Sequence, residues 1–387
     1  MPDKSYKKRI AIINQRYGKE INGGSEYFTR QLAQHLSFDY KIQILTTCAK
    51  NYTTWKNEYP KGNCLVDGIE VIRFPVTKMR NPRKFRWIDR MVRYSPIKKK
   101  QLQQYWIREQ GPYCPDLIEY IKAHEKTYDL FIFVTYLYYP TAMGLPMVSE
   151  KSILIPTAHE EPYIQFEIYQ KIFQIPKAII YLTQEEKDYV QTIFHNSNIK
   201  NQIIGMGISV PEKKRIQNKH NPYLIYAGRI DLGKNCKELF DYFLEYQKHT
   251  SKKLSLLLIG TRYISIPNNS WIQYLGFVSE EKKYELISGA VALCLPSKYE
   301  SFSIAVLEAM ALETPVLVNG ACNVLKGHCK KSKAGYCYYD KKSFQNGVEH
   351  LLDKAINSEM GRNGKVYIKE NYQWDFIIKS YQDMIEL

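Results

Sequence analysis

The sequence predicts an α/β protein built from two doubly wound domains. Short apolar segments rich in Ile, Val, Leu and Tyr recur along the chain, and amphipathic, helix-like segments lie between several of them. Apolar strands that alternate with helices are typical of parallel sheets covered on both faces. The polar segment "KKRIQNKHNP" (213–222) interrupts this pattern, which then restarts. We therefore expect one doubly wound domain on each side of a boundary near residue 210.

The expected strands can be named by their letters. In the first half they are "RIAIINQ", "KIQILTTCA", "GIEVIRFP", "DLFIFV", "SILIPTA", "AIIYLT" and "NQIIGMGI". In the second half they are "YLIYAGRI", "LSLLLIG", "IQYLGF", "AVALCLPS" and "PVLVNG". The domains are expected at 1–209 and 210–370. Residues 371–387 form a last helix, with Trp374, Ile378, Tyr381 and Ile385 spaced along one face.

Several other classes of protein are disfavoured by the sequence. The uncharged run from Leu130 to Ser149 contains Pro140, Gly144 and Pro146, so it predicts a strand, a loop and a short helix rather than a membrane span. The loop after the first strand lacks the GxGxxG spacing of a nicotinamide-binding enzyme. The eight cysteines form no CxxC pair, which favours reduced thiols in the cytoplasm and no metal site.

A basic segment, residues 78–108, accounts for much of the net charge of +16. It holds eleven Lys or Arg and one acidic residue, with Phe85, Trp87 and Tyr94 among them. Such a segment can lie on an anionic membrane, bind an anionic acceptor or bind nucleic acid, or it can be a solvated face. No nucleic-acid module is visible elsewhere, so nucleic acid is the least favoured partner.

Chemistry is expected where strands end, because ligands of open α/β sheets bind at the carboxyl ends of strands. Gly23 and Gly24 follow the first strand, and they either let a ligand approach the backbone or form a tight strand-to-helix turn. His159 follows "SILIPTA", beside two glutamates, and it either moves a proton or is a structural polar group. Arg229 and Lys234 lie five residues apart before a helix, which favours a diphosphate-binding pair.

The segment "PSKYESFSIAVLEAMALETPV" (296–316) combines two carboxylates with a helix start. The helix is expected to begin near Ser301 or Ser303, either of which can cap it. The backbone N–H groups from Phe302 to Ala305 then form an anion site. Glu300 before this site and Glu308 inside the helix can accept hydrogen bonds from sugar hydroxyls. Together with Arg229 and Lys234 they describe a pocket for a nucleotide sugar.

These motifs, in this order, resemble the retaining glycosyltransferases of family 4, which have the GT-B fold. The resemblance includes "GRIDLGK", the E-x7-E pair Glu300 and Glu308, and the terminal "WD" helix. It implies that a nucleoside-diphosphate sugar, UDP- or GDP-linked, binds mainly to the second domain without a metal or other cofactor. It also implies that the last helix packs on the first domain. Many members have Gly where this chain has Ser301, so the effect of Ser301 on the sugar pocket stays open.

The resemblance assigns a role to each candidate residue. Catalytic roles fall to His159, Glu300, Arg229 and Lys234, with Glu300 at the donor sugar. Glu308 is expected on the ribose, and the loop with Phe277 and Val278 on the nucleobase. Donor contacts are expected from Gly23, Gly24, Arg229, Lys234, Phe277, Val278, Glu300, Phe302, Ser303, Ile304 and Glu308.

The expected function is transfer of a hexose-type sugar to a glycan or lipid-linked acceptor in the synthesis of a cell-surface polysaccharide or glycolipid. The protein is expected in the cytoplasm, either free or peripheral at the inner face of the membrane. Two alternatives stay open. One is a GT-B sugar-nucleotide epimerase or phosphorylase, and the other is a non-enzymatic binder of polyanions or membrane surfaces.

Overall fold

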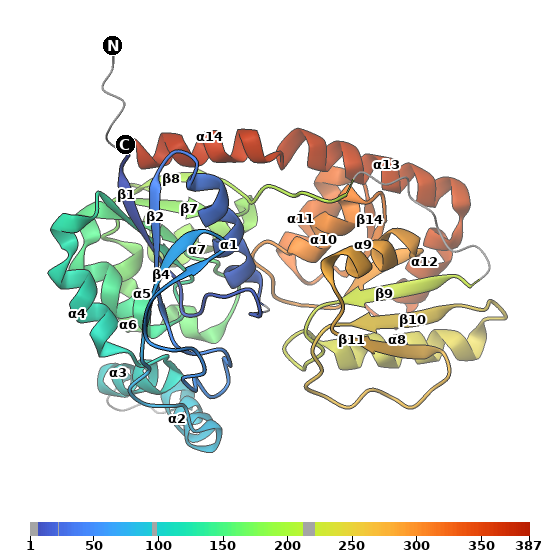
Figure 1. Ribbon diagram of the computed structural model, residues 1–387. Coiled ribbons are helices and arrows are strands. Elements are labelled where there is room, and N and C mark those ends of the chain that lie inside the picture. Colours follow the sequence, from blue (N-terminus) through green and yellow to red (C-terminus); the bar gives the residue numbers. More distant parts are fainter. Residues whose placement is uncertain (1–6, 22, 95–98, 212–220) are drawn as a thin grey trace, which may run out of the picture. The chain divides into compact units, whose positions relative to one another are not determined.

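The computed structural model describes residues 7–21, 23–94, 99–211 and 221–387, and it divides into two compact units. The first unit is Met1–Met206 with Ile378–Leu387, and the second is Gly207–Ile377. Each unit is a largely parallel sheet with helices on its faces (Figure 1), so the predicted α/β class is confirmed. Residues 212–220, which include most of the predicted polar break at 213–222, lie outside the described residues.

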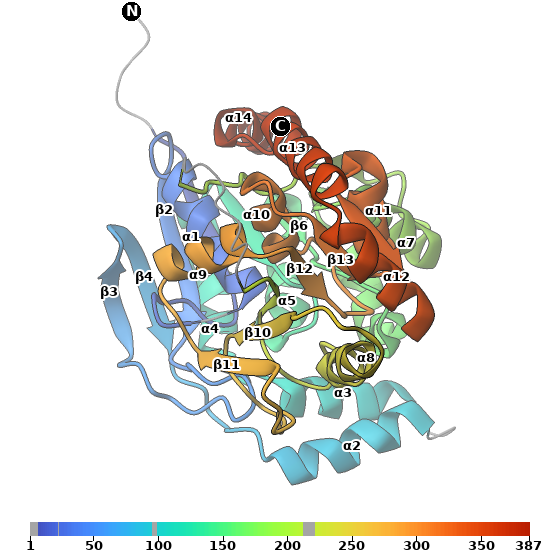
Figure 2. The same cartoon turned by 90° about the vertical axis from the view of Figure 1, so that its right-hand side faces the viewer.

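The first unit contains an eight-stranded sheet in the order β3-β4-β2-β1-β5-β6-β7-β8. Its strands are β1 (Arg9–Ile13), β2 (Lys41–Thr47), β3 (Gly62–Val66), β4 (Ile69–Phe74), β5 (Leu130–Val134), β6 (Ser152–Ile155), β7 (Ala178–Tyr181) and β8 (Lys200–Ile203). Neighbouring strands are parallel except β3, which runs antiparallel to β4 at the edge of the sheet (Figure 2). β3 was not predicted, because this edge strand is mostly exposed and has no apolar run.

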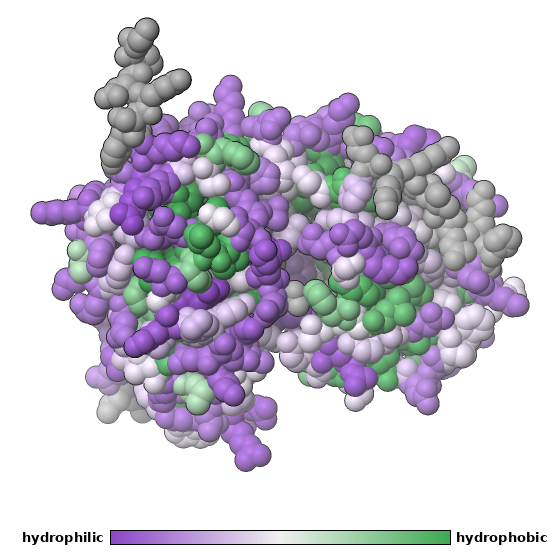
Figure 3. Space-filling model, in the orientation of Figure 1, coloured by the Kyte–Doolittle hydropathy of each residue, from purple (hydrophilic) through white to green (hydrophobic). Residues whose placement is uncertain are grey.

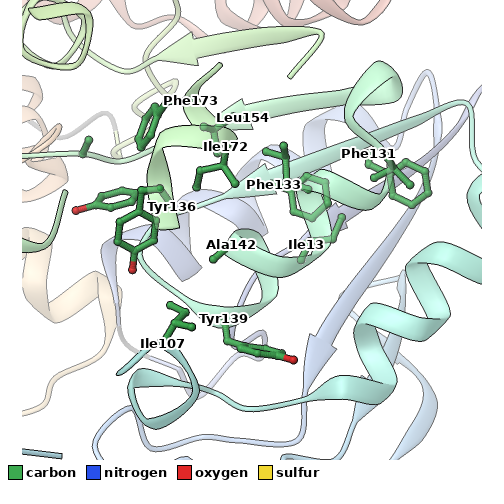
Figure 4. Packing of buried hydrophobic residues seen from close by; sticks show 14 of the residues in the cluster. Ile13, Ile107, Phe131, Phe133, Tyr136, Tyr139, Ala142, Leu154, Ile172 and Phe173 are labelled. Atoms are coloured by element: carbon green, nitrogen blue, oxygen red, sulfur yellow. The ribbon is translucent and has the colours of Figure 1, made fainter. Parts of the chain in front are cut away.

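Helices bury the two faces of this sheet. They are α1 (Gly24–Leu36), α2 (Pro82–Tyr94), α3 (Lys99–Gln110), α4 (Pro115–Ala123), α5 (Tyr139–Gly144), α6 (Glu167–Gln170) and α7 (Gln184–Phe194). Ile13, Phe133 and Leu154 from three neighbouring strands pack with Ala142 of α5 in one buried cluster (Figure 4). Because successive strand residues face opposite sides, the equally buried Ile12 points to the other face. None of the helices in the described ranges has the length and apolar character needed to cross a membrane.

The last helix, α14 (Trp374–Ile385), contains the boundary between the two units. Its second half belongs to the first unit, where Tyr381 is fully buried and donates a hydrogen bond to the carbonyl of Gly205. Just beyond the helix, Glu386 accepts hydrogen bonds from Lys8 at 2.5 Å and Tyr40 at 3.0 Å. The buried face includes Ile377 rather than the predicted Ile378, which is half-buried.

The second unit contains a six-stranded parallel sheet in the order β11-β10-β9-β12-β13-β14. Its strands are β9 (Tyr223–Ala227), β10 (Ser255–Ile259), β11 (Ile272–Gly276), β12 (Ala292–Leu295), β13 (Val316–Asn319) and β14 (Gly335–Tyr338). Its helices are α8 (Cys236–His249), α9 (Glu280–Gly289), α10 (Ile304–Ala311), α11 (Asn323–Ser332), α12 (Lys341–Leu352) and α13 (Lys354–Asn371). Strand β14 was not predicted, because "GYCY" is short and its residues are mostly half-buried.

Candidate functional site

The chain order of the second sheet reverses between β9 and β12. The chain proceeds from β9 to β10 and β11 on one side, and from β12 to β13 and β14 on the other. β9 and β12 pair directly, with Leu293 opposite Ile225. In open α/β sheets a ligand crevice forms outside the carboxyl ends of the strands at such a reversal. The loops that follow β9 and β12 carry Arg229 with Lys234, and Glu300, respectively.

These two loops meet through an ion pair. The Lys234 Nζ lies 2.6 Å from the Glu300 Oε1, and both side chains are mostly buried. Asp231, which the sequence analysis missed, organises the first loop: its Oδ1 accepts the backbone N–H of Lys234 at 2.7 Å, and its Oδ2 lies 3.6 Å from the Arg229 Nε. The structure therefore brings Arg229, Lys234 and Glu300 together at the strand ends.

Helix α10 begins directly after Glu300 and its loop. Ser303 is the N-cap residue, as one of the two predicted alternatives has it, but it makes no side-chain cap hydrogen bond. Its φ of 65° places it in the left-handed region, rather than in the extended conformation from which a cap side chain reaches the first turn. The prediction of a capping hydroxyl was therefore wrong. At the start of α10 the N–H groups of Val306 and Leu307 donate to the Ser303 carbonyl. Helix geometry leaves the N–H groups of Ile304 and Ala305 without a carbonyl partner in the helix.

The buried His328 of α11 supports this loop from behind. Its Nε2 lies 2.9 Å from the carbonyl oxygen of Phe302, and because a carbonyl only accepts, Nε2 carries the proton. Its Nδ1 lies 3.1 Å from the hydroxyl of Tyr367. Phe302 is itself buried, so it anchors the loop instead of facing solvent. Within the described residues, no group of three His, Cys, Asp or Glu side chains is arranged to hold a metal ion.

Glu308 lies one turn into α10 and is almost fully buried. Its Oε1 accepts hydrogen bonds from the Lys283 Nζ at 2.7 Å and from the Tyr284 hydroxyl at 3.3 Å, both on α9. Burial raises the pKa of Glu308, and the ammonium of Lys283 opposes that rise. Lys283 was missed, because a lysine in the first turn of a polar helix has no signal of its own in the sequence.

The loop between β11 and α9 carries Phe277 and Val278. The Phe277 side chain is 67% exposed, whereas Val278 is half-buried. Ser279 caps α9 by accepting the N–H of Lys282 at 3.3 Å. The same short segment therefore carries the exposed ring of Phe277 and leads into α9, the helix whose Lys283 and Tyr284 donate hydrogen bonds to Glu308.

Close approach of the strand ends requires glycine at one position. Gly260 follows β10 with a φ of 122°, and a Cβ there would lie 2.0 Å from the carbonyl oxygen of Gly228, which follows β9. Any side chain would therefore force the loop that carries Arg229 to move.

The first unit holds the other predicted residues. Gly23 is the N-cap of α1, and Gly24 is its first residue. A Cβ on Gly23 would lie 2.1 Å from the Glu26 Oε2, whereas one on Gly24 would meet nothing within 4 Å. Gly23 therefore makes room for the carboxylate of Glu26, which forms a buried ion pair with Arg16 at 2.5 Å. Burial alone would raise the pKa of Glu26, but Arg16 holds it below its ordinary value.

His159 is half-buried in the loop that follows β6. Its neighbours are held tightly. The N–H of Ala158 donates to the Glu186 Oε1 at 2.6 Å, and the Tyr136 hydroxyl donates to the Glu161 Oε1 at 2.6 Å. Glu186 was not predicted, although "TQEE" after a strand is a helix-start pattern in which Thr183 caps α7.

Glu186 makes the stability of the protein depend on pH. Burial raises its pKa to about 8 from an ordinary 4.5, even though the N–H groups of Leu182 and Ala158 lower it. The folded state thus keeps a proton that the unfolded state releases, so this contribution is complete below about pH 4.5 and is lost as the pH rises through about 8. The neighbouring Tyr181 and Tyr381 have raised pKa values and stay neutral over this range.

We expect Glu186→Gln to remove this dependence. Urea unfolding at about pH 5 and about pH 9 measures it. Wild type should lose more stability than the variant between these two values, and equal losses would contradict the assignment.

Comparison with known families gives a match in the second unit. Residues 209–367 match the model of the family described as glycosyl transferases group 1. This match lies within the second unit, Gly207–Ile377, and covers less than half of the chain. The resemblance predicted from the motifs is thereby confirmed for residues 209–367.

Two curated relatives match part of the chain. An uncharacterized glycosyltransferase of Methanocaldococcus jannaschii is 30% identical over 168 residues, which cover 43% of this chain and 37% of that protein. The O-antigen chain mannosyltransferase B of Escherichia coli is 26% identical over 125 residues, which cover 30% of this chain and 33% of that protein. The matched segments thus span about a third of the length of these relatives.

Solved structures match the fold over nearly the whole chain. Sucrose-phosphate synthase from Thermosynechococcus elongatus has a TM-score of 0.71 at 17% identity, covering 98% of both chains. The Anabaena protein HepE, solved in complex with UDP and glucose, has a TM-score of 0.69 at 11% identity, covering 98% of this chain and 99% of that one. The predicted GT-B fold is confirmed.

Proposed function

We propose that this protein is a retaining glycosyltransferase that moves a hexose-type sugar from a nucleoside-diphosphate sugar to a glycan or lipid-linked acceptor. The observation that carries the proposal is the cluster at the reversal between β9 and β12. There Lys234 and Arg229 lie beside Glu300, directly before the start of α10. Cations and free helix N–H groups suit a diphosphate, and carboxylates suit the hydroxyls of a sugar.

The diphosphate is the leaving group of this reaction, and negative charge grows on it as the glycosidic bond breaks. Arg229, Lys234 and the N–H groups at the start of α10 stabilise that charge. The Lys234 Nζ is already oriented by Glu300 at 2.6 Å, so it needs little rearrangement to act. Glu300, in the loop just before α10, accepts hydrogen bonds from hydroxyls of the donor sugar.

The nucleoside binds along α9 and α10. Glu308 accepts the ribose hydroxyls through Oε2, while its Oε1 is held by Lys283 and Tyr284. The exposed ring of Phe277 stacks on the base. HepE was solved with UDP and glucose, and one relative is named a mannosyltransferase, so UDP-glucose and GDP-mannose are the first donors to test.

His159, in the first unit, is the residue that we propose to act on the donor sugar at the scissile bond. Gly23 and Gly24 contribute the start of α1 on the acceptor side. The rigid backbone on both sides of His159 supports this role, because a group that acts on a reacting bond must be held in place.

Donor turnover tests the proposal against its main alternative. A transferase consumes its nucleotide sugar only slowly without an acceptor and rapidly with one. Steady epimer formation from a nucleotide sugar alone, or phosphorolysis of a glycan, would instead identify a GT-B epimerase or phosphorylase.

Helix α2 provides the surface that fits an acceptor at a membrane. Arg83, Arg86, Trp87, Arg90 and Tyr94 are all exposed and share one face by their spacing. Trp87 is 62% exposed and Tyr94 74%. The opposite face is anchored, because the buried Asp89 accepts a hydrogen bond from the Trp106 indole of α3 at 3.1 Å. The surface at the lower left of Figure 3, where Figure 1 places α2, is largely hydrophilic.

We propose that this face binds anionic lipid through its arginines and inserts Trp87 and Tyr94 at the headgroup level. Lys98, another basic residue of the 78–108 segment, lies outside the described residues. The triple change of Arg83, Arg86 and Arg90 to Gln should abolish sedimentation with anionic liposomes. A matched change of the exposed Lys248, Lys252 and Lys253 should not. Equal binding of the arginine variant and wild type would contradict the membrane role of α2 and would not affect the proposed transferase activity.

A further inference from the structure

Two threonines at neighbouring strand ends of the first unit have unusual backbones. Thr135 follows β5 with a φ of 73°, and Thr157 follows β6 with a φ of 50°. A β-branched residue rarely adopts a positive φ, because its side chain crowds the backbone there. Such outliers persist only where the surrounding structure enforces them, and they cluster at functional sites.

The two threonines are joined to each other. The hydroxyl of Thr157 donates to that of Thr135 at 3.1 Å. The backbone continues the connection, because the N–H of Thr135 donates to the Ile155 carbonyl at 2.9 Å and that of Tyr136 donates to the Pro156 carbonyl at 3.0 Å. The ends of β5 and β6 are therefore locked together just before His159.

The chain is fixed again on either side of the histidine. Ala158 is tied to Glu186, whose other carboxylate oxygen accepts the N–H of Leu182 at 2.6 Å beyond the end of β7. Glu161 is tied to the buried Tyr136. Three neighbouring strand ends thus hold one short segment, with His159 in its middle.

We propose that Thr157, held by Thr135, is a positioning residue that sets the direction of His159 toward the reacting sugar. This inference rests on the proposed function, since it assigns the strained backbone a positioning role in the same sugar transfer. A relaxed backbone at residue 157 would rotate the chain that leads to His159, two residues on. The strain therefore lowers the stability of the folded state, and the backbone direction that it maintains raises kcat.

Thr157→Gly tests this most directly, because it removes the hydroxyl bonded to Thr135 and frees the backbone to leave its positive φ, while glycine adopts a positive φ without strain. We expect kcat for sugar transfer to fall about 10-fold while the donor KM stays within about 2-fold, since positioning affects the reacting bond and not donor binding. The melting temperature should stay level or rise. By contrast, Thr46→Gly, in the interior of β2 where φ is not positive, should lower it. Thr157→Ser keeps the hydroxyl and should retain most of kcat.

A double-mutant cycle with His159→Ala distinguishes the possible outcomes. If Thr157 acts through His159, Thr157→Gly should cause no further loss of kcat in the His159→Ala background. An equal loss in both backgrounds, an unchanged kcat, or a fall in melting temperature like that of Thr46→Gly would each overturn the inference alone. Full turnover by His159→Ala would instead overturn the role of His159 in the proposed function, and the inference with it.

Discussion

Lys234→Ala should lower kcat/KM for the donor by about 10²- to 10³-fold, the effect of removing one preorganised group that stabilises a leaving-group charge. The reason lies in the ion pair of Lys234 with Glu300 at 2.6 Å. Removing the lysine takes a cation from the diphosphate and also leaves a mostly buried carboxylate beside it. The second effect makes the site repel an anion. A coupled assay for release of the nucleoside diphosphate measures the loss.

Lys237→Ala is the matched control. This exposed lysine lies three residues further along, in α8, and it should keep wild-type turnover. Thermal unfolding of both variants checks that each is folded. Similar turnover of Lys234→Ala and Lys237→Ala would show that Lys234 is not part of a diphosphate site.

Lys283→Met should lower the free energy of unfolding by about 3 kcal/mol, because it leaves a buried carboxylate without its cation. The Glu308 side chain is 5% exposed and that of Lys283 22%. Without the ammonium, burial is free to raise the pKa of Glu308 further, so the protein must unfold or protonate this group. The loss should therefore shrink at acidic pH, where Glu308 protonates. Urea unfolding at neutral and acidic pH measures both effects.

Two further variants make the result specific to Glu308. Lys282→Met removes the neighbouring lysine, which forms only a surface pair with Glu285, and should change stability by less than about 1 kcal/mol. The double variant Lys283→Met with Glu308→Gln should recover most of the stability, since no charge stays buried. A loss in Lys283→Met no larger than that in Lys282→Met would contradict the pairing.

Local patterns in the sequence were enough to predict the fold class and to name Arg229, Lys234 and Glu300, which the structure brings together at the strand ends of the second unit. An apolar strand can be recognised from its own short segment of sequence. The strand ends that carry Arg229, Lys234 and Glu300 could be recognised in the same way. What escaped prediction depends on contacts between distant segments. Lys283 matters only because α9 packs beside α10, and Glu186 only because α7 starts beside the end of β6.

The wrong prediction of a capping hydroxyl has the same origin. Ser303 has the residue type of a helix cap, yet the tertiary structure holds its backbone in the left-handed region, where its hydroxyl makes no cap bond. The prediction that Gly23 contacts a ligand stays a prediction, and the structure adds that the absence of a side chain there makes room for the carboxylate of Glu26. The strained threonines look ordinary in the sequence, because a positive φ has no signature when the residue is not glycine.

A thermal-shift screen across nucleoside-diphosphate sugars tests the central claim most directly, because a ligand that binds only the folded state raises the melting temperature. We expect at least one nucleoside-diphosphate sugar to stabilise the protein at millimolar concentration. The matching nucleoside monophosphate should do so far less, and Lys234→Ala should lose the shift. No stabilisation by any nucleoside-diphosphate sugar, or an equal shift with the monophosphate, would contradict a diphosphate site at Arg229, Lys234 and the start of α10.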